Sequence, residues 1–182
     1  MREARDIAGN YAHHRILIAE EATKPAVMAE IKMASVIHLA THGIIDERSS
    51  TNSRLVMARP VTDDSEDGAL RAYEIVRMRL PHVRLVVLSA CQSGVERFYR
   101  GEGLIGLSRA FLAAGAPTVV ASMWTVDSDV TAALMTDFHR QLKTYSISQA
   151  LRQAQLSLLR SANPQFNLPY YWAAFSVFGG EG

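Results

Sequence analysis

Apolar and polar positions alternate along this chain in a way that predicts buried strands separated by helices. Continuous runs rich in Val, Ile and Leu occupy 35–40, 84–89 and 118–122, and such runs are typical of strands in a parallel sheet. Between and after them, apolar residues recur at helical spacing. The pattern predicts an α/β fold in which a mostly parallel central sheet is flanked by helices.

The remaining elements follow from local signals. Thr23 is a suitable N-cap and Pro25 suits the first turn of a helix reaching about residue 33, while Gly115 is a suitable C-cap for a helix that starts near Glu102. We expect further helices over 2–13, 69–80, 129–143 and 147–160, and further strands over 15–18, 55–57 and 173–178.

Length and charge narrow the class of protein. A chain of 182 residues, 48% of them hydrophobic, can bury one substantial core, so residues 1–182 are expected to form a single domain. The formal charge of +1 gives no electrostatic footprint for nucleic acid or an anionic membrane, and neither partner is expected.

Cysteine content and the start of the chain indicate a compartment. The single cysteine excludes an internal disulfide, the first residues are polar, and there is no run of about 18 apolar residues. These features predict a cytoplasmic protein.

Two residues of types that can take part in catalysis follow two of the predicted strands. His42 comes just after the run 35–40, and Cys91, the only cysteine, comes just after the run 84–89. Ligands and chemistry gather at the carboxyl ends of the strands in open α/β sheets, so both residues are expected at one rim. A free thiol has a pKa near about 8.5, and a nearby imidazole both generates the thiolate and protonates the leaving amine. The pair therefore predicts a cysteine peptidase, with Gly43 allowing a close approach of backbone to substrate.

Four segments together resemble one known family. They are HLATHG at 38–43, LSACQSG at 88–94, GEGLIGLSRAFLAAGAPTVVASMW at 101–124 and YWAAFSVFGG at 171–180. In this order they resemble the CHAT family, caspase-like domains that are commonly attached to tetratricopeptide repeats. The resemblance covers the chain from about Ile16 onward, and the spacing of 49 residues from His42 to Cys91 is similar to the roughly 50 residues noted for caspases.

The resemblance implies a function and its residues. It implies a caspase-like fold, a His42–Cys91 dyad that cleaves peptide bonds of a protein or peptide substrate, and an oxyanion hole formed by the backbone amides of Gly43 and Cys91. It also implies a tetratricopeptide-repeat or other regulatory partner. CHAT domains generally carry a further strand and helix before the part that corresponds to 15–18, so we expect an N-terminally shortened domain. No cofactor motif is present, so no cofactor is expected.

Two aspartates follow the strand 118–122. The segment from Trp124 to Thr131 looks like the separase segment that places an acidic residue in the pocket for a basic P1 side chain, so Asp127 and Asp129 are candidate substrate-binding residues. Alternatively, either aspartate caps the helix that follows. One aspartate can also cap while the other binds substrate.

The other histidines have structural interpretations. His38, inside the apolar run, is expected to be a hydrogen-bonded core or supporting histidine. It would lie about 13 Å from His42 along a strand, which argues against a shared metal ion. Surface positions are expected for His13, His14, His82 and His139.

The sequence is also compatible with two other functions. The chain is a candidate for a catalytically silent, caspase-like interaction module that associates with a repeat-containing or sensor protein. The same dyad would also suit a thiol hydrolase or transferase acting on a small molecule.

Overall fold

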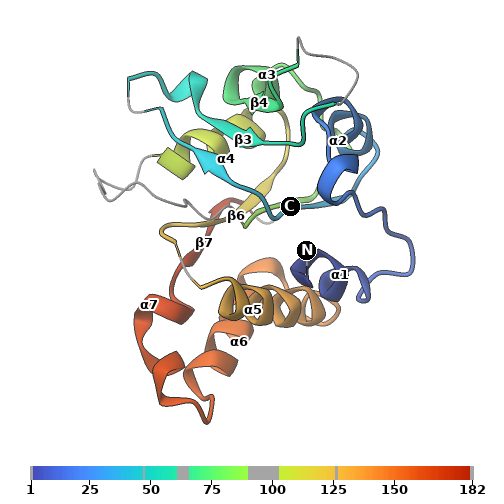
Figure 1. Cartoon of the computed structure of the whole chain (residues 1–182). Helices are drawn as coiled ribbons and strands as arrows, with labels where there is room; N and C mark the ends of the chain where they lie inside the picture. The colour runs from blue at the N-terminus through green and yellow to red at the C-terminus, as the bar shows by residue number, and fades with distance from the viewer. Residues whose placement is uncertain (1, 47, 61–65, 90–102, 126, 181–182) are drawn as a thin grey trace.

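A computed structural model describes residues 2–46, 48–60, 66–89, 103–125 and 127–180. Its centre is a four-stranded sheet in the order β1-β5-β6-β7, drawn in Figure 1. Strands β1 (Val36–Leu39), β5 (Leu85–Leu88) and β6 (Thr118–Ser122) run parallel, whereas β7 (Phe175–Gly179) is antiparallel to β6. All residues of β5 and β6 are buried, which explains their uninterrupted apolar sequence. The predicted α/β fold with a mostly parallel sheet is confirmed.

One face of this sheet is covered by three helices and a small second sheet (Figure 1). The helices are α2 (Lys24–Ile31), α3 (Ala72–Val76) and α4 (Gly103–Ala113). The small sheet is antiparallel and consists of β2 (Gly43–Ile44), β3 (Arg54–Val56) and β4 (Ala69–Arg71). Leu55, Leu70, Ile75 and Phe111 are completely buried between these layers.

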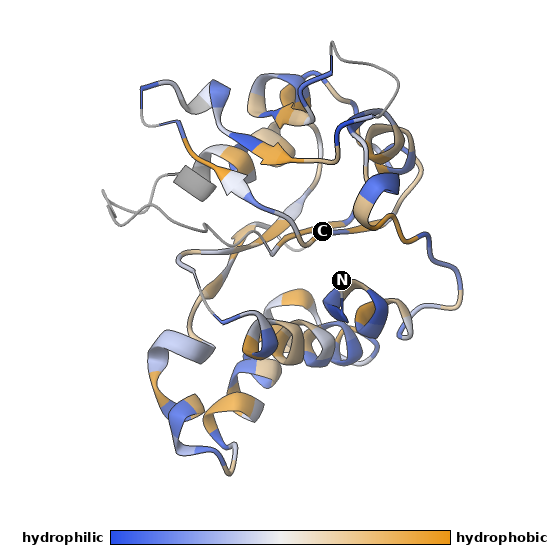
Figure 2. Cartoon of the chain, in the orientation of Figure 1, coloured by the Kyte–Doolittle hydropathy of each residue, from blue (hydrophilic) through white to orange (hydrophobic). Residues whose placement is uncertain are grey.

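The opposite face is covered by α1 (Arg2–Ala8), α5 (Ser128–Gln141) and α6 (Ile147–Leu159), with α7 (Pro169–Trp172) after them (Figure 1). Figure 2 shows the apolar central strands between helices that carry many polar positions. Three short 3-10 helices complete the described fold: η1 (Ala19–Glu21), η2 (Ser50–Asn52) and η3 (Pro164–Asn167). Within the described ranges, no helix is long and apolar enough to span a bilayer.

Local signals in the sequence located two helix ends correctly. The Thr23 hydroxyl accepts a hydrogen bond from the Ala26 amide at 3.5 Å, and Pro25 lies in the first turn of α2. After α4, Gly115 has a φ of 109° and its amide donates to the Leu112 carbonyl at 3.0 Å. A residue without Cβ suits this left-handed turn.

Three of the predicted elements are wrong in extent or type. The segment 15–18 is not a strand, and the helix expected over 2–13 ends at Ala8. The amphipathic stretch 69–80 divides into β4 and α3, because residues 69–71 pair with β3. Tertiary pairing outweighs helical periodicity in such a short segment.

The surface position expected for His139 is also wrong. Its relative exposure is 1%, and it lies on the buried face of α5 with Leu134, Met135 and Phe138. His139 stands four residues after Met135, so helical spacing alone places the two side chains on the same face.

Candidate active site

The candidate site lies where the parallel strands end. In the register of β1 and β5, Leu39 is opposite Leu88, and the Ser89 amide donates to the Leu39 carbonyl at 3.0 Å. The next strand, β6, continues the sheet in the same direction. The carboxyl ends of β1, β5 and β6 therefore form one rim, and His42 follows β1 at this rim as the sequence predicts.

Strand β3 holds the backbone around His42. The Val56 amide donates to the His42 carbonyl at 2.8 Å, and the Thr41 hydroxyl donates to the Val56 carbonyl. The His42 residue is exposed, whereas Gly43 is buried. The His42 backbone is therefore fixed on a sheet while the residue remains exposed, an arrangement suited to a residue that must meet a substrate.

The same hydrogen bond orients the Gly43 amide. Carbonyl and N–H of a trans peptide point in opposite directions, and the described chain has no cis peptide bond. Because the His42 carbonyl points toward β3, the Gly43 N–H points away from β3. This donor therefore lies outside the β2–β3 ladder.

Cys91, the predicted nucleophile, lies outside the described residues, which reach Ser89 on this strand. The His42–Cys91 distance and the Cys91 amide of the oxyanion hole therefore stay predictions. Ser89 itself is 5% exposed, and its hydroxyl has no hydrogen-bond partner among the residues described.

Asp46, in the loop after Gly43, makes several hydrogen bonds with the surrounding backbone and with Ser53. The Asp46 amide donates to the Ser53 hydroxyl at 3.1 Å, and its carboxylate accepts hydrogen bonds from the Arg48 and Ser49 amides at 2.9 and 3.1 Å. These backbone donors lower the pKa of Asp46. An Asp46 carboxylate that stays ionised therefore holds the Arg48 and Ser49 amides of the loop beside His42.

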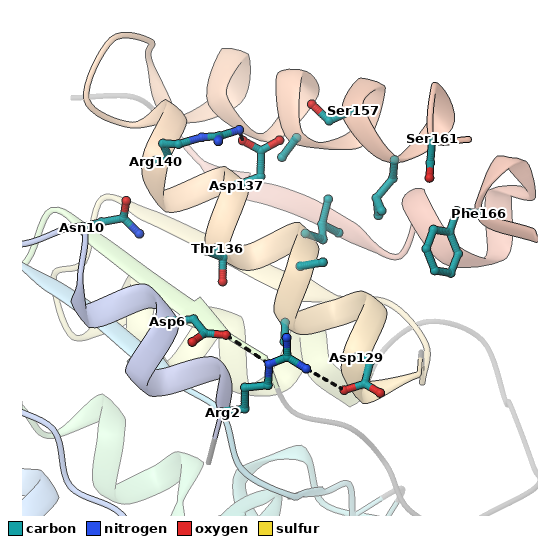
Figure 3. A pocket seen from close by; sticks show the side chains of 15 residues that line it. Arg2, Asp6, Asn10, Asp129, Thr136, Asp137, Arg140, Ser157, Ser161 and Phe166 are labelled. Atoms are coloured by element: carbon teal, nitrogen blue, oxygen red, sulfur yellow. Dashed lines mark hydrogen bonds and ion pairs between the residues drawn. The ribbon is translucent and has the colours of Figure 1, made fainter. Parts of the chain in front are cut away.

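At the end of β6, the two predicted substrate-binding aspartates have different contacts. Asp127 is the N-cap of α5, and its Oδ1 accepts from the Asp129 and Val130 amides at 2.9 and 3.3 Å. Asp129 lies 3.9 Å from the Arg2 guanidinium of α1, and both side chains are largely exposed (Figure 3). The capping alternative is thus confirmed for Asp127, while substrate binding by either residue stays a prediction.

Helix α7 is attached to the same end of β6, a contact that sequence reasoning missed. The Trp124 indole donates to the Tyr170 carbonyl at 2.9 Å, and the Tyr170 hydroxyl donates to the Thr125 carbonyl at 2.7 Å. Tyr170 is 51% exposed. The partners are 45 and 46 residues apart in sequence, and no local pattern predicts such a contact.

A pocket of about 520 Å³ opens elsewhere, between α1, α5 and α6 (Figure 3). Arg2, Asp6, Asp129, Asp137 and Arg140 supply its charges. Arg2 pairs with Asp6 at 3.4 Å, and Arg140 pairs with Asp137 at 2.5 Å. His42 is not part of its lining, although Asp129, which follows the end of β6, is.

Fold and rim together define an α/β protein of caspase-like type, with a histidine beyond one strand of a mostly parallel sheet. Comparison with known families gives a match to the CHAT domain over residues 1–180. The chain belongs to the CHAT domain family.

Two curated relatives are similar over most of the chain. Tetratricopeptide repeat protein 28 of Homo sapiens is 27% identical over 195 aligned residues, which cover 91% of this chain and 8% of the relative. Its counterpart in Mus musculus is 28% identical with the same coverage. The chain therefore spans only a small part of the length of these relatives.

Proposed function

We propose that this chain is a cysteine endopeptidase that uses His42 and Cys91 as a catalytic dyad. The observation that carries the proposal is the register of β1 and β5, in which Leu39 is opposite Leu88. His42 and Cys91 each come three residues after that pair. A histidine and a thiol that follow two paired parallel strands by the same number of residues suit a catalytic dyad at one rim.

The proposed reaction is acyl transfer. His42 takes the thiol proton, the Cys91 sulfur attacks the scissile carbonyl carbon, and the negative charge moves to the carbonyl oxygen. Collapse of this intermediate breaks the C–N bond as His42 gives its proton to the leaving amine. Water then attacks the thioester, with His42 again as the base, and releases the carboxylic acid and the thiol.

The Gly43 amide supports this mechanism. Its N–H points away from β3, so it is available to a developing oxyanion instead of a ladder hydrogen bond. We assign it, with the Cys91 amide, to the oxyanion hole. One donor of this kind contributes about 2.7–4 kcal/mol of transition-state stabilisation where it has been measured.

Covalent labelling tests the assignment of the nucleophile. We expect a peptidyl electrophile with a thiol-reactive group to add one mass equivalent to the wild-type protein, at Cys91. Labelling should be slower in His42→Ala, because the thiol loses its base. The same electrophile without its peptide portion is the control. Equal labelling rates with both reagents and in both proteins would mean that Cys91 is an ordinary surface thiol.

We further propose a preference for basic P1 residues, recognised by Asp127 or Asp129. Both are exposed after the end of β6, and both hydrogen bonds to the Asp127 carboxylate fall on Oδ1. The carboxylate can therefore keep its capping role while its other oxygen meets a cationic side chain.

A panel of peptides that differ only at P1 tests this preference. Peptides with Arg or Lys at P1 should be cleaved about 10 to 100 times faster than those with Asp, as expected for a charged hydrogen bond. The preference should disappear in one of two variants, Asp127→Asn or Asp129→Asn. Asn is as good an N-cap as Asp, so Asp127→Asn removes the charge while retaining the cap. A preference that survives in both variants would locate P1 recognition elsewhere.

A second candidate function is a silent interaction module within a larger tetratricopeptide-repeat protein. The names of the two relatives favour it, and the chain matches only 8% of their length. Under this function the chain would bind a repeat-containing partner and turn over no peptide, and labelling would not depend on His42. For either function we propose that residues 1–182 form a single domain. We also propose a cytoplasmic location, because a lone cysteine stays reduced there.

A further inference from the structure

Four polar side chains form a continuous hydrogen-bonded chain through the core on the α5 side of the sheet. Glu3 of α1 lies 2.9 Å from His38 Nε2 of β1, and His38 Nδ1 lies 3.0 Å from His139 Nε2 of α5. His139 Nδ1 lies 2.6 Å from the Tyr11 hydroxyl. The predicted role of His38 as a hydrogen-bonded core histidine is thus confirmed. The side chains of Glu3 and His38 are 14% and 9% exposed, so the chain is largely shielded from water.

Only one assignment of protons satisfies this chain when Glu3 is ionised and both histidines are neutral. A carboxylate only accepts, so His38 must donate through Nε2–H, which leaves its Nδ1 as an acceptor. His139 must then donate through Nε2–H and accept at Nδ1. The Tyr11 hydroxyl completes the series as a donor. Every hydrogen bond therefore points from Tyr11 toward Glu3.

Adding one proton reverses part of this series without breaking it. A proton from water binds the Tyr11 oxygen as the original hydroxyl proton passes to His139 Nδ1, and the His139 Nε2 proton passes to His38 Nδ1. His38 then carries two N–H groups and a positive charge beside the Glu3 carboxylate. His139 remains neutral as its other tautomer, with Nδ1–H donating to the Tyr11 oxygen. All three hydrogen bonds persist in both states.

Surrounding charges favour the proton at the Glu3 end. Tyr11 and His139 line a pocket of about 510 Å³ whose walls include Arg84 and Lys143, so the Tyr11 end is next to water and two cations. At the other end the Glu3 carboxylate contacts His38 directly. Other charged groups of α1 and α5 form ion pairs with one another: Arg2 with Asp6 and Asp129, and Asp137 with Arg140.

The pKa values of His139 and Tyr11 agree with a proton placed at the Glu3 end of the hydrogen-bonded series. Burial, together with a smaller contribution from the neighbouring His38, lowers the pKa of His139 to about 3. Burial raises the pKa of Tyr11 to about 12. His139 and Tyr11 are therefore both neutral over the physiological range and carry hydrogen bonds rather than charge.

We propose that Glu3, His38, His139 and Tyr11 form a proton-linked latch that holds α1 on the fold. Glu3 and Tyr11 come from α1 and the residues just after it, whereas His38 and His139 come from β1 and α5. Before proton uptake, neutral His38 donates a hydrogen bond to the Glu3 carboxylate. After uptake of one proton, His38 is positively charged and the same contact is an ion pair. Because hydrogen bonds between charged groups are the stronger kind, mild acidification tightens the attachment of α1.

Tautomer-sensitive NMR of ¹⁵N-histidine-labelled protein tests the latch between pH 8 and pH 5. At pH 8 we expect protonated Nε2 and bare Nδ1 in both His38 and His139. On acidification His38 should become an imidazolium ion while His139 reverses to Nδ1–H and stays neutral. Conversion of His139 to imidazolium in the folded protein, or retention of its Nε2–H tautomer while His38 titrates, would overturn the proposal.

Amide hydrogen exchange tests the link to α1. In wild type, protection of α1 amides should rise across the His139 reversal by about tenfold relative to β5 amides, whereas Glu3→Gln should show no rise. In Tyr11→Phe the tautomer reversal of His139 should require a proton concentration about tenfold higher, because His139 Nδ1–H would be buried without an acceptor. Tyr145→Phe, a change in the lining of the same pocket but outside the chain, is the matched control. Protection of α1 that does not change with pH in wild type would also overturn the latch.

Discussion

Cys91→Ala and His42→Ala should each lower kcat/KM for a cleavable peptide by at least about 10⁴-fold, and the double variant should be no worse than the more damaging single variant. Nucleophile and base act as a unit, so removing one leaves the other without a role. Steady-state cleavage of a fluorogenic peptide by the three variants measures this. The free energy of unfolding should change little in His42→Ala, because the His42 residue is exposed and its backbone carbonyl still accepts from Val56.

His82→Ala is the control for this series, since it removes another exposed histidine away from the rim. It should keep wild-type kinetics. Turnover retained by Cys91→Ala would eliminate the dyad outright. Additive losses in the double variant would mean that His42 and Cys91 act independently. Absence of turnover in every protein, including wild type, together with His42-independent labelling, would support the interaction module.

The central strands could be predicted because burial on both faces permits only one sequence pattern, an uninterrupted apolar run. A strand buried on both faces must be apolar at every position, as Leu85 and Val86 illustrate, and such runs are easily recognised. The site followed from the same signal, because His42 is the first histidine beyond such a run. Residues 15–18 carry a similar apolar sequence but form no strand in the structure. Apolar composition permits a strand, whereas hydrogen-bonding partners decide whether one forms.

Features that depend on contacts between distant segments could not be predicted. Helical spacing places His139 on the apolar face of its helix, but its hydrogen-bond partners, His38 and Tyr11, lie 101 and 128 residues away in the sequence. The attachment of Tyr170 to Thr125 likewise joins segments 45 residues apart. Asp127 is the reverse case, because N-capping depends on the next three residues alone and was foreseen as an alternative.

The C-terminal end of β7 depends on a glycine for two reasons. Gly179 has a φ of 91°, a conformation that residues with a Cβ rarely adopt. A Cβ at this position would overlap the Pro117 carbonyl oxygen and would lie 2.8 Å from the Leu112 side chain. The backbone cannot easily retreat, because Gly179 is paired with Thr118 of β6 and the Gly180 amide donates to Pro117 at 3.1 Å.

Gly179→Ala should therefore lower the free energy of unfolding by roughly 2–4 kcal/mol, the combined cost of a strained backbone and an overpacked contact. Gly180→Ala is the matched control: a Cβ there meets nothing within 4 Å, and its effect should stay within about 0.5 kcal/mol. Urea unfolding of both variants, followed by far-UV circular dichroism, measures the difference. Because the overlap is with backbone, Leu112→Ala should fail to rescue Gly179→Ala. Equal stability of the two glycine variants would show that β7 can end in another conformation without loss.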